Sequence, residues 1–110
     1  MVAIAAMFLC PLAASAQARR RSVRGTVTDQ FGAPLNGAVV RIENTWSLRV
    51  RSYIVQSDGA YQFRGLMRNV DYKLKAKYFG ASSRRKRLDR FDSREEAVID
   101  LVIEVRGARS

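Results

Sequence analysis

The sequence contains no histidine, a single cysteine and two prolines. Without histidine, the Ser-His-Asp and Cys-His arrangements that activate a nucleophile are excluded. The only cysteine, Cys10, lies in an apolar N-terminal stretch, so removal of that stretch would leave no thiol for zinc or for a disulfide. The glycines form neither a GxGxxG nor a P-loop pattern, so the sequence indicates no nucleotide site.

Residues 1–18, MVAIAAMFLCPLAASAQA, contain no charged side chain. The run is shorter than the roughly 20 apolar residues that cross a bilayer, and it ends in small residues, with Ala16 and Ala18 as candidate cleavage positions. This pattern is typical of a signal peptide, although no basic residue precedes it, and an uncleaved anchor or a buried strand is the alternative. We therefore expect export, to the periplasm or outside the cell, and a short basic leader over residues 19–21.

The remaining chain shows no apolar period of the helical kind, except for one possible helical turn over residues 93–98. Short stretches instead alternate apolar and polar side chains, most clearly in VDYKLKAKYF (70–79). About seven such stretches are separated by turn signals such as Asp58-Gly59, and the last covers residues 97–105. This pattern predicts an all-β fold, an antiparallel sandwich.

Three blocks of sequence resemble a known family. The segments VRGTVTDQFGAPLNGAVVRIEN, SDGAYQFRGL and DYKLKAKYFG are similar, in order and spacing, to the carboxypeptidase regulatory-like domain. The matching positions are Gly25, Val27, Asp29, Gly32, Pro34, Leu35, Gly37, Ala38 and Val40, then Asp58, Gly59, Tyr61, Phe63, Gly65 and Leu66, then Tyr72 and Leu74. The resemblance implies a transthyretin-like (prealbumin-like), immunoglobulin-like sandwich over residues 22–105 with a tail at 106–110, as in small exported bacterial members made of this domain alone.

The matching positions belong to turns and core, so they support a fold and no activity. In this family the domain accompanies peptidases and is not their catalytic core, and a urate-pathway hydrolase with the same fold relies on histidines. We therefore expect no catalytic residue, no cofactor and no metal. The acids of the C-terminal third alternate with Arg90 and Arg94, which favours ion pairs over a calcium site; they are Asp89, Asp92, Glu95, Glu96, Asp100 and Glu104.

Basic residues outnumber acidic ones by 20 to 10, which gives a net charge of +10. The densest group, the basic hairpin, contains no acid and consists of Lys73, Lys75, Lys77, Arg84, Arg85, Lys86 and Arg87. The three lysines share one sheet face about 7 Å apart, and the two basic runs become neighbours if residues 84–88 pair back across the turn at 80–83. The sequence favours a role in solubility and edge protection. The alternative is a site for an anionic envelope polymer, a lipid phosphate or an acidic protein.

One aromatic residue leaves a choice open. Trp46 lies in the loop NTWSL, where an exposed ring would suit recognition, but we expect the ring to fold back over the sandwich edge.

The predicted function is a non-catalytic exported module for binding or scaffolding in the cell envelope. The alternative is a basic nucleic-acid-binding protein, which the N-terminal segment and the lack of interleaved stacking aromatics disfavour.

Overall fold

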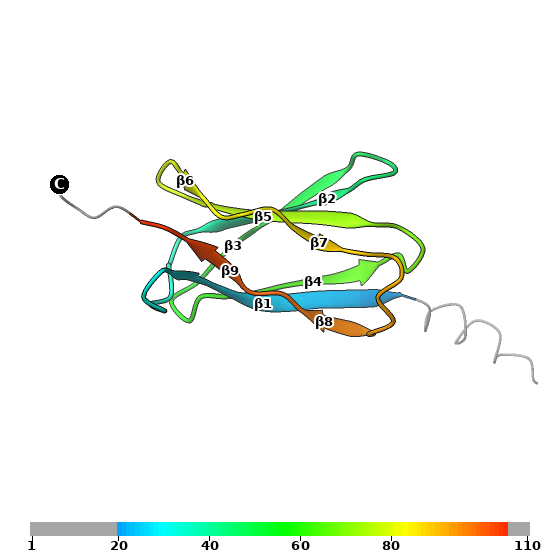
Figure 1. Ribbon diagram of the computed structural model, residues 1–110, viewed down its shortest axis with the longest axis horizontal. Helices are drawn as coiled ribbons and strands as arrows, with labels where there is room; N and C mark the ends of the chain where they lie inside the picture. Colours follow the sequence, from blue (N-terminus) through cyan, green and yellow to red (C-terminus); the bar gives the residue numbers. More distant parts are fainter. Residues whose placement is uncertain (1–19, 106–110) are drawn as a thin grey trace, which may run out of the picture.

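The computed structural model describes residues 20–105, which form two facing β-sheets (Figure 1). The strands are β1 (Arg21–Asp29), β2 (Val39–Asn44), β3 (Val50–Ile54), β4 (Ala60–Leu66), β5 (Tyr72–Tyr78), β6 (Ala81–Ser82), β7 (Lys86–Leu88), β8 (Glu96–Val98) and β9 (Leu101–Ile103). Across these residues there is no helix with the length and apolar character needed to cross a membrane. The predicted signal peptide (1–18), Arg19 and the tail (106–110) lie outside the described residues.

The two sheets are built on β1 and on β5. Strand β1 pairs antiparallel with β4 and parallel with β8 and then β9. The second sheet has the order β3-β2-β5, and β5 also pairs with both β6 and β7. The predicted all-β sandwich is thus confirmed, but it is not antiparallel throughout, because β8 and β9 return along β1 in the same direction.

The last predicted strand is divided in two. The alternation over residues 97–105 predicts one strand, but β8 and β9 are separated at Ile99 and Asp100. The Asp100 carboxylate accepts hydrogen bonds from the backbone N–H (3.0 Å) and the hydroxyl (3.2 Å) of Thr26, so a side chain replaces a ladder bond there. The possible helical turn over residues 93–98 does not form, because β8 pairs with β1 instead.

The turns follow from local chemistry, as predicted. The Asp29 carboxylate accepts hydrogen bonds from the N–H groups of Phe31 and Ala33, both at 2.9 Å. The Asp58 carboxylate accepts from the N–H of Ala60 at 3.0 Å. Gly59 has a φ of 74°, in the left-handed region that favours glycine. These short-range bonds end the strands at the positions that the sequence indicates.

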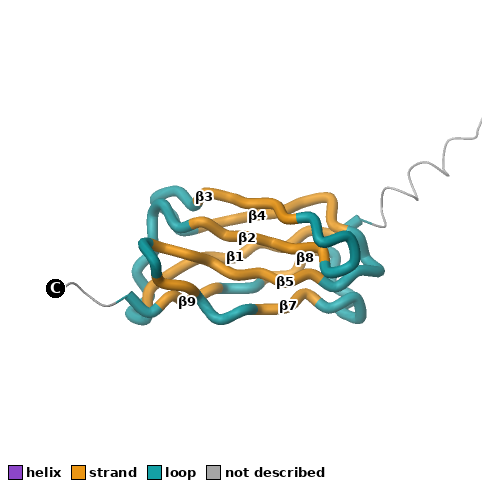
Figure 2. The backbone as a smooth tube through the Cα atoms, turned by 90° about the horizontal axis from the view of Figure 1, so that it is seen from above, coloured by secondary structure: helices purple, strands orange, loops and turns teal. Residues whose placement is uncertain are grey.

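The core fills the space between the sheets with the inward side chains of each strand. Tyr61 and Phe63 are both buried there, as predicted. Figure 2 shows β3 and β4 along one edge of the sandwich, where Arg51 of β3 donates to the backbone carbonyl of Arg64 on β4 (3.0 Å) and lies 5.5 Å from the centre of the Phe63 ring. The buried apolar residues include Val23, Val27, Val40, Ile42, Val55, Leu66, Leu74, Leu88, Leu101 and Ile103.

Arg21 does not belong to a basic leader. It is the first residue of β1, it shares a face with Val23, and only 3% of its surface is exposed. Its guanidinium donates hydrogen bonds to the backbone carbonyls of Asp92 (2.9 Å) and Val70 (3.2 Å). Burial lowers the pKa of this guanidinium, and the negative charge of Asp92 acts in the opposite direction. The side chain therefore ties the loop before β5 to the loop before β8.

Candidate functional site

The candidate site is the outer face of the sheet formed by β3, β2, β5 and β7. The inward side chains of β5 are buried in the core, so Lys73, Lys75 and Lys77 are left on the outer face. Residues directly opposite each other on antiparallel strands project from the same face. Arg41 of β2 lies opposite Lys75, and Glu43 lies opposite Lys73. The register thus brings a cation from β2 into the row of lysines.

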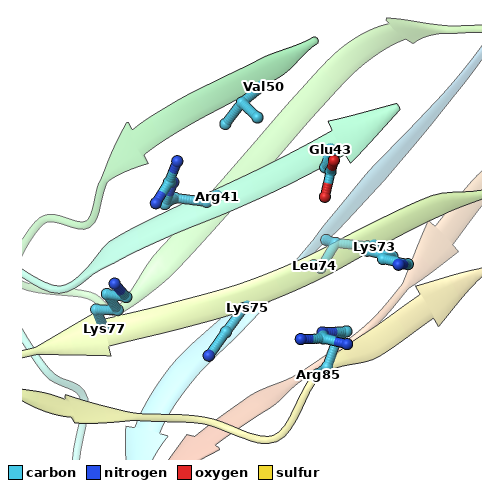
Figure 3. Close-up of a pocket in the computed structure, with 8 residues that line it drawn as sticks. All are labelled: Arg41, Glu43, Val50, Lys73, Leu74, Lys75, Lys77 and Arg85. Atoms are coloured by element: carbon cyan, nitrogen blue, oxygen red, sulfur yellow. The ribbon is translucent and has the colours of Figure 1, made fainter. Parts of the chain in front are cut away.

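These side chains surround an open groove of about 240 Å³. Figure 3 shows the three lysines along β5, with Arg41 on one side and Arg85 on the other. We call this feature the basic groove; its lining consists of Arg41, Glu43, Val50, Lys73, Leu74, Lys75, Lys77 and Arg85. The lining holds five cations and one carboxylate, so the groove presents a positive surface.

The groove places two like charges at facing positions of neighbouring strands. Arg41 and Lys75 carry the same charge and lie directly opposite each other, an arrangement that destabilises a sheet. Among the described residues, no ion pair within 4.0 Å joins a lysine of the groove to a carboxylate. The positive charge therefore remains available to an anion from outside the chain.

The structure divides the predicted basic hairpin. Strands β6 and β7 pair back onto β5, so the two basic runs are neighbours. Arg85 joins the groove, whereas Arg87, opposite Lys73, has its guanidinium 3.7 Å from the carboxylate of Asp71. Two further cations do not line the groove: Arg84 is exposed, and Lys86 lies opposite the buried Leu74, on the other side of the sheet.

Sequence reasoning missed Arg41. Its only signal is its place in AVVRIEN, where it alternates with the buried Val40 and Ile42 and so belongs on the outer face. Local alternation does not reveal that β2 pairs with β5, nor which lysine faces the arginine. Only the register of the two strands places Arg41 in the groove.

The prediction of ion pairs in the C-terminal third is confirmed in part: among the described residues, three of the six acids form ion pairs, and one of these pairs involves an alternating arginine, Arg94. Glu96 pairs with Arg24 at 3.2 Å, and Glu95 pairs with Arg68 at 3.1 Å. Asp92 binds Arg94 at 2.6 Å, and hydrogen bonds from Arg94 hold the pKa of the Asp92 carboxyl at about 2. Within residues 20–105, His, Cys, Asp and Glu side chains form no group of three that could hold a metal ion.

The expectation for Trp46 was wrong. The indole does not fold back over the sandwich edge, since 81% of the residue is exposed. The Asn44 side chain accepts hydrogen bonds from the backbone N–H groups of Trp46 (2.8 Å) and Ser47 (3.0 Å). These bonds fix a tight turn that directs the ring into solvent.

Comparison with known proteins gives the fold. No curated protein sequence matches this chain significantly. The dioxygenase domain of a dioxygenase carbohydrate-binding protein fusion from Streptomyces sp. SirexAA-E is similar, with 17% identity, a TM-score of 0.58 and coverage of 80% of this chain and 81% of that chain. Chlorocatechol 1,2-dioxygenase from Pseudomonas putida is similar with 14% identity and a TM-score of 0.59, and the match covers 79% of this chain and 61% of that chain. A C-terminal fragment of the pilus adhesin SpaC from Lactobacillus rhamnosus GG is similar with 9% identity and a TM-score of 0.55, and the match covers 83% of this chain and 47% of that chain.

At these identities, the similar structures establish a shared sandwich and nothing about activity. The sequence carries more specific information. The model of the carboxypeptidase regulatory-like domain matches residues 22–104, which include every strand of both sheets except the first residue of β1. The chain therefore belongs to the carboxypeptidase regulatory-like domain family.

Proposed function

We propose that this protein is a non-catalytic, exported module that binds an anionic polymer of the cell envelope through the basic groove. The observation that carries the proposal is the gathering of five cations from β2, β5 and the segment before β7 around one open groove with a single carboxylate. The facing positions of Arg41 and Lys75 bring two like charges onto neighbouring strands, an arrangement with a stability cost that a bound anion would relieve.

The shape of the groove favours a polymer over a small molecule. The three lysines follow one strand with a spacing of about 7 Å, which suits a ligand with repeated charges. A volume of about 240 Å³ is below the range of roughly 300–1,000 Å³ that encloses a small ligand. A polymer chain can lie across such a surface and make several weak contacts at once.

Export and the lack of catalysis are supported by separate features. The uncharged segment 1–18 has the pattern of a signal peptide, and a pilus adhesin is among the proteins of similar fold. The chain has no histidine to act as a general base. Nucleic acid is a weaker candidate ligand, because the groove lining includes no aromatic side chain on which a base could stack.

The test compares two variants that lose the same charge. The first carries Lys73→Gln, Lys75→Gln and Lys77→Gln in the groove. The second carries Arg64→Gln, Arg84→Gln and Lys86→Gln, at exposed positions outside the groove lining. Binding to wall teichoic acid, lipopolysaccharide and double-stranded DNA is measured by titration across a salt series.

We expect one envelope polymer to bind at physiological salt, with affinity reduced about tenfold or more in the groove variant and much less in the second variant. Equal losses in the two variants would show a generic basic surface and would overturn the proposal. Tighter binding to DNA than to either envelope polymer would favour the nucleic-acid alternative instead.

A further inference from the structure

One end of the sandwich presents apolar side chains on three separate loops. The residues are Trp46 and Leu48 between β2 and β3, Met67 after β4, and Phe91 after β7, and all four are exposed. Figure 1 shows these three connections at the end where β1 begins, on the right of the view. We call this feature the loop end.

The exposure of the β2–β3 loop is built into its backbone. The Thr45 N–H (3.1 Å) and hydroxyl (2.8 Å) both donate to the backbone carbonyl of Asp71, and the Asn44 side chain holds the turn at Trp46. Leu48 has a φ of 65°, a left-handed conformation that is unfavourable for leucine. The loop is therefore held in a shape that leaves 81% of Trp46 and 66% of Leu48 in water.

The three loops meet at one hollow. Trp46, Met67, Asn69, Asp71 and Arg90 are among the residues that line a hollow of about 470 Å³. The Asp71 carboxylate accepts a hydrogen bond from the backbone N–H of Arg90 (2.7 Å), so it is engaged within the protein. The loop end is thus one surface. Its other acids are Asp89, Asp92 and Glu95, of which Asp92 pairs with Arg94 and Glu95 pairs with Arg68.

Each loop also carries arginine beside its apolar residue. The neighbouring pairs in the sequence are Leu48 and Arg49, Met67 and Arg68, and Arg90 and Phe91. The Arg90 guanidinium lies 5.1 Å from the centre of the Phe91 ring. Aromatic and aliphatic tips flanked by guanidinium groups combine the two attractions, apolar burial and charge, that hold peripheral proteins on anionic membranes.

The opposite end lacks this combination. Phe31 and Phe79 are highly exposed there. Their neighbours in the sequence are Gln30 and Gly32, and Tyr78 and Gly80, none of which is basic. The two ends therefore differ in the residues that flank their exposed aromatic rings.

We propose that the loop end docks on the surface of an anionic lipid bilayer. Trp46, Leu48 and Phe91 enter the boundary between headgroups and acyl chains, where aromatic rings are favoured, and Arg49 and Arg90 bind lipid phosphates. Strand β1 begins at this end, and the exposed Arg20 that precedes it adds a cation there. The basic groove lies on a sheet face instead, so it can bind a polymer independently.

The test uses the fluorescence of Trp46, the single tryptophan of the chain. The full chain is titrated with vesicles of equal parts phosphatidylcholine and phosphatidylglycerol, with phosphatidylcholine alone, and with lipids brominated on the acyl chains. We expect a blue shift of the emission on anionic vesicles and quenching by the brominated lipids. Excitation at a wavelength that the four tyrosines do not absorb restricts the signal to Trp46. Matched variants then separate docking by the loop end from anchoring by the apolar segment 1–18.

Two matched variants keep the tryptophan. Leu48→Ser with Phe91→Ser removes apolar area from the loop end, and Phe31→Ser with Phe79→Ser removes it from the opposite end. The fluorescence-detected affinity for anionic vesicles should fall about tenfold or more in the first variant and remain unchanged in the second. Equal effects in both variants would overturn the proposal.

Two further outcomes would overturn the proposal that the loop end docks on a membrane. Cosedimentation with vesicles without any change in Trp46 emission would place the membrane contact elsewhere and refute docking by the loop end. An emission shift with soluble oligosaccharides, and none with vesicles, would assign the loop end to a sugar ligand instead. The triple lysine variant of the basic groove should retain the Trp46 shift, so failure of the groove proposal is distinguishable from failure of this one.

Discussion

Single residues set how closely neighbouring strands and their connections approach. At Gly25 a Cβ atom would lie 1.9 Å from the backbone oxygen of Ile99, so no larger residue fits without a shift of the backbone. The Tyr61 hydroxyl donates to the same oxygen at 2.5 Å. Burial raises the pKa of Tyr61, and the charge of Asp100 adds to this effect, so the hydroxyl remains a donor. A missing side chain and a buried hydroxyl together hold the turn between β8 and β9 against β1.

Arg21 provides a test at this scale. Replacing it with methionine keeps most of its volume but removes the donors to the carbonyls of Asp92 and Val70. We expect the free energy of unfolding to fall by roughly 2 kcal/mol, because two carbonyls lose their partners in a buried position. Urea denaturation measures the change.

The matched control is Arg20→Met, at an exposed neighbour with one hydrogen bond, to the backbone carbonyl of Gly65, and it should change stability by less than about 0.5 kcal/mol. An Arg21→Met protein as stable as the original would mean that the cost of burying the guanidinium cancels its hydrogen bonds. That result would contradict the tying role assigned to Arg21.

At the scale of elements, strand β5 combines two roles in one alternation. Its inward residues Tyr72, Leu74 and Ala76 belong to the core, and the lysines between them line the basic groove. The core-facing side chains of β5 stabilise the fold, and repulsion among the charges on its outer face destabilises it. The pairing with β2 intensifies this opposition, because Arg41 lies opposite Lys75.

Substitution of Lys75 with glutamate should separate stability from binding. The repulsion with Arg41 becomes an attraction, so we expect the free energy of unfolding to rise by about 0.5–1 kcal/mol, while affinity for the anionic polymer falls. Thermal unfolding and polymer titration give the two values. Lys86→Glu is the control. Lys86 lies opposite Leu74, so the free energy of unfolding of the Lys86→Glu protein should change little. A destabilised Lys75→Glu protein would refute the repulsion between Arg41 and Lys75.

At the scale of the whole molecule, charge and burial are unevenly distributed. The chain carries a net charge of +10, and the basic groove holds five cations on one sheet face. Ion pairs such as Arg24 with Glu96 are exposed, and exposed pairs of this kind contribute little to stability. The apolar core therefore stabilises the sandwich, while the net charge opposes its compact state.

This imbalance predicts a dependence on salt. Raising the ionic strength from about 0.01 M to about 0.15 M shortens the range of charge repulsion, so the melting temperature should rise by about 4 °C, which corresponds to roughly 1 kcal/mol for a domain of this size. Calorimetry in sodium chloride measures the rise. The triple lysine variant of the groove should show a smaller rise, and a melting temperature independent of salt would contradict the prediction.

The sequence by itself determined the features that depend on near neighbours. Alternation along each strand predicted which side chains form the core, and Asp58-Gly59 predicted a turn, because both depend on backbone geometry over a few residues. The alternation of acids and arginines likewise predicted the ion pair of Asp92 with Arg94, whereas Glu95 and Glu96 pair with the remote Arg68 and Arg24. The absence of histidine excluded the common forms of nucleophilic catalysis by composition alone.

Only the tertiary structure decided which distant residues meet. The parallel return of β8 and β9 along β1, the burial of Arg21, the outward turn of Trp46 and the arrival of Arg41 beside Lys75 all depend on contacts between remote segments. Strand alternation specifies a face, but the partner strand and the register specify the neighbour across it. The basic groove is therefore a property of the register between β2 and β5, and it could not be predicted from either strand alone.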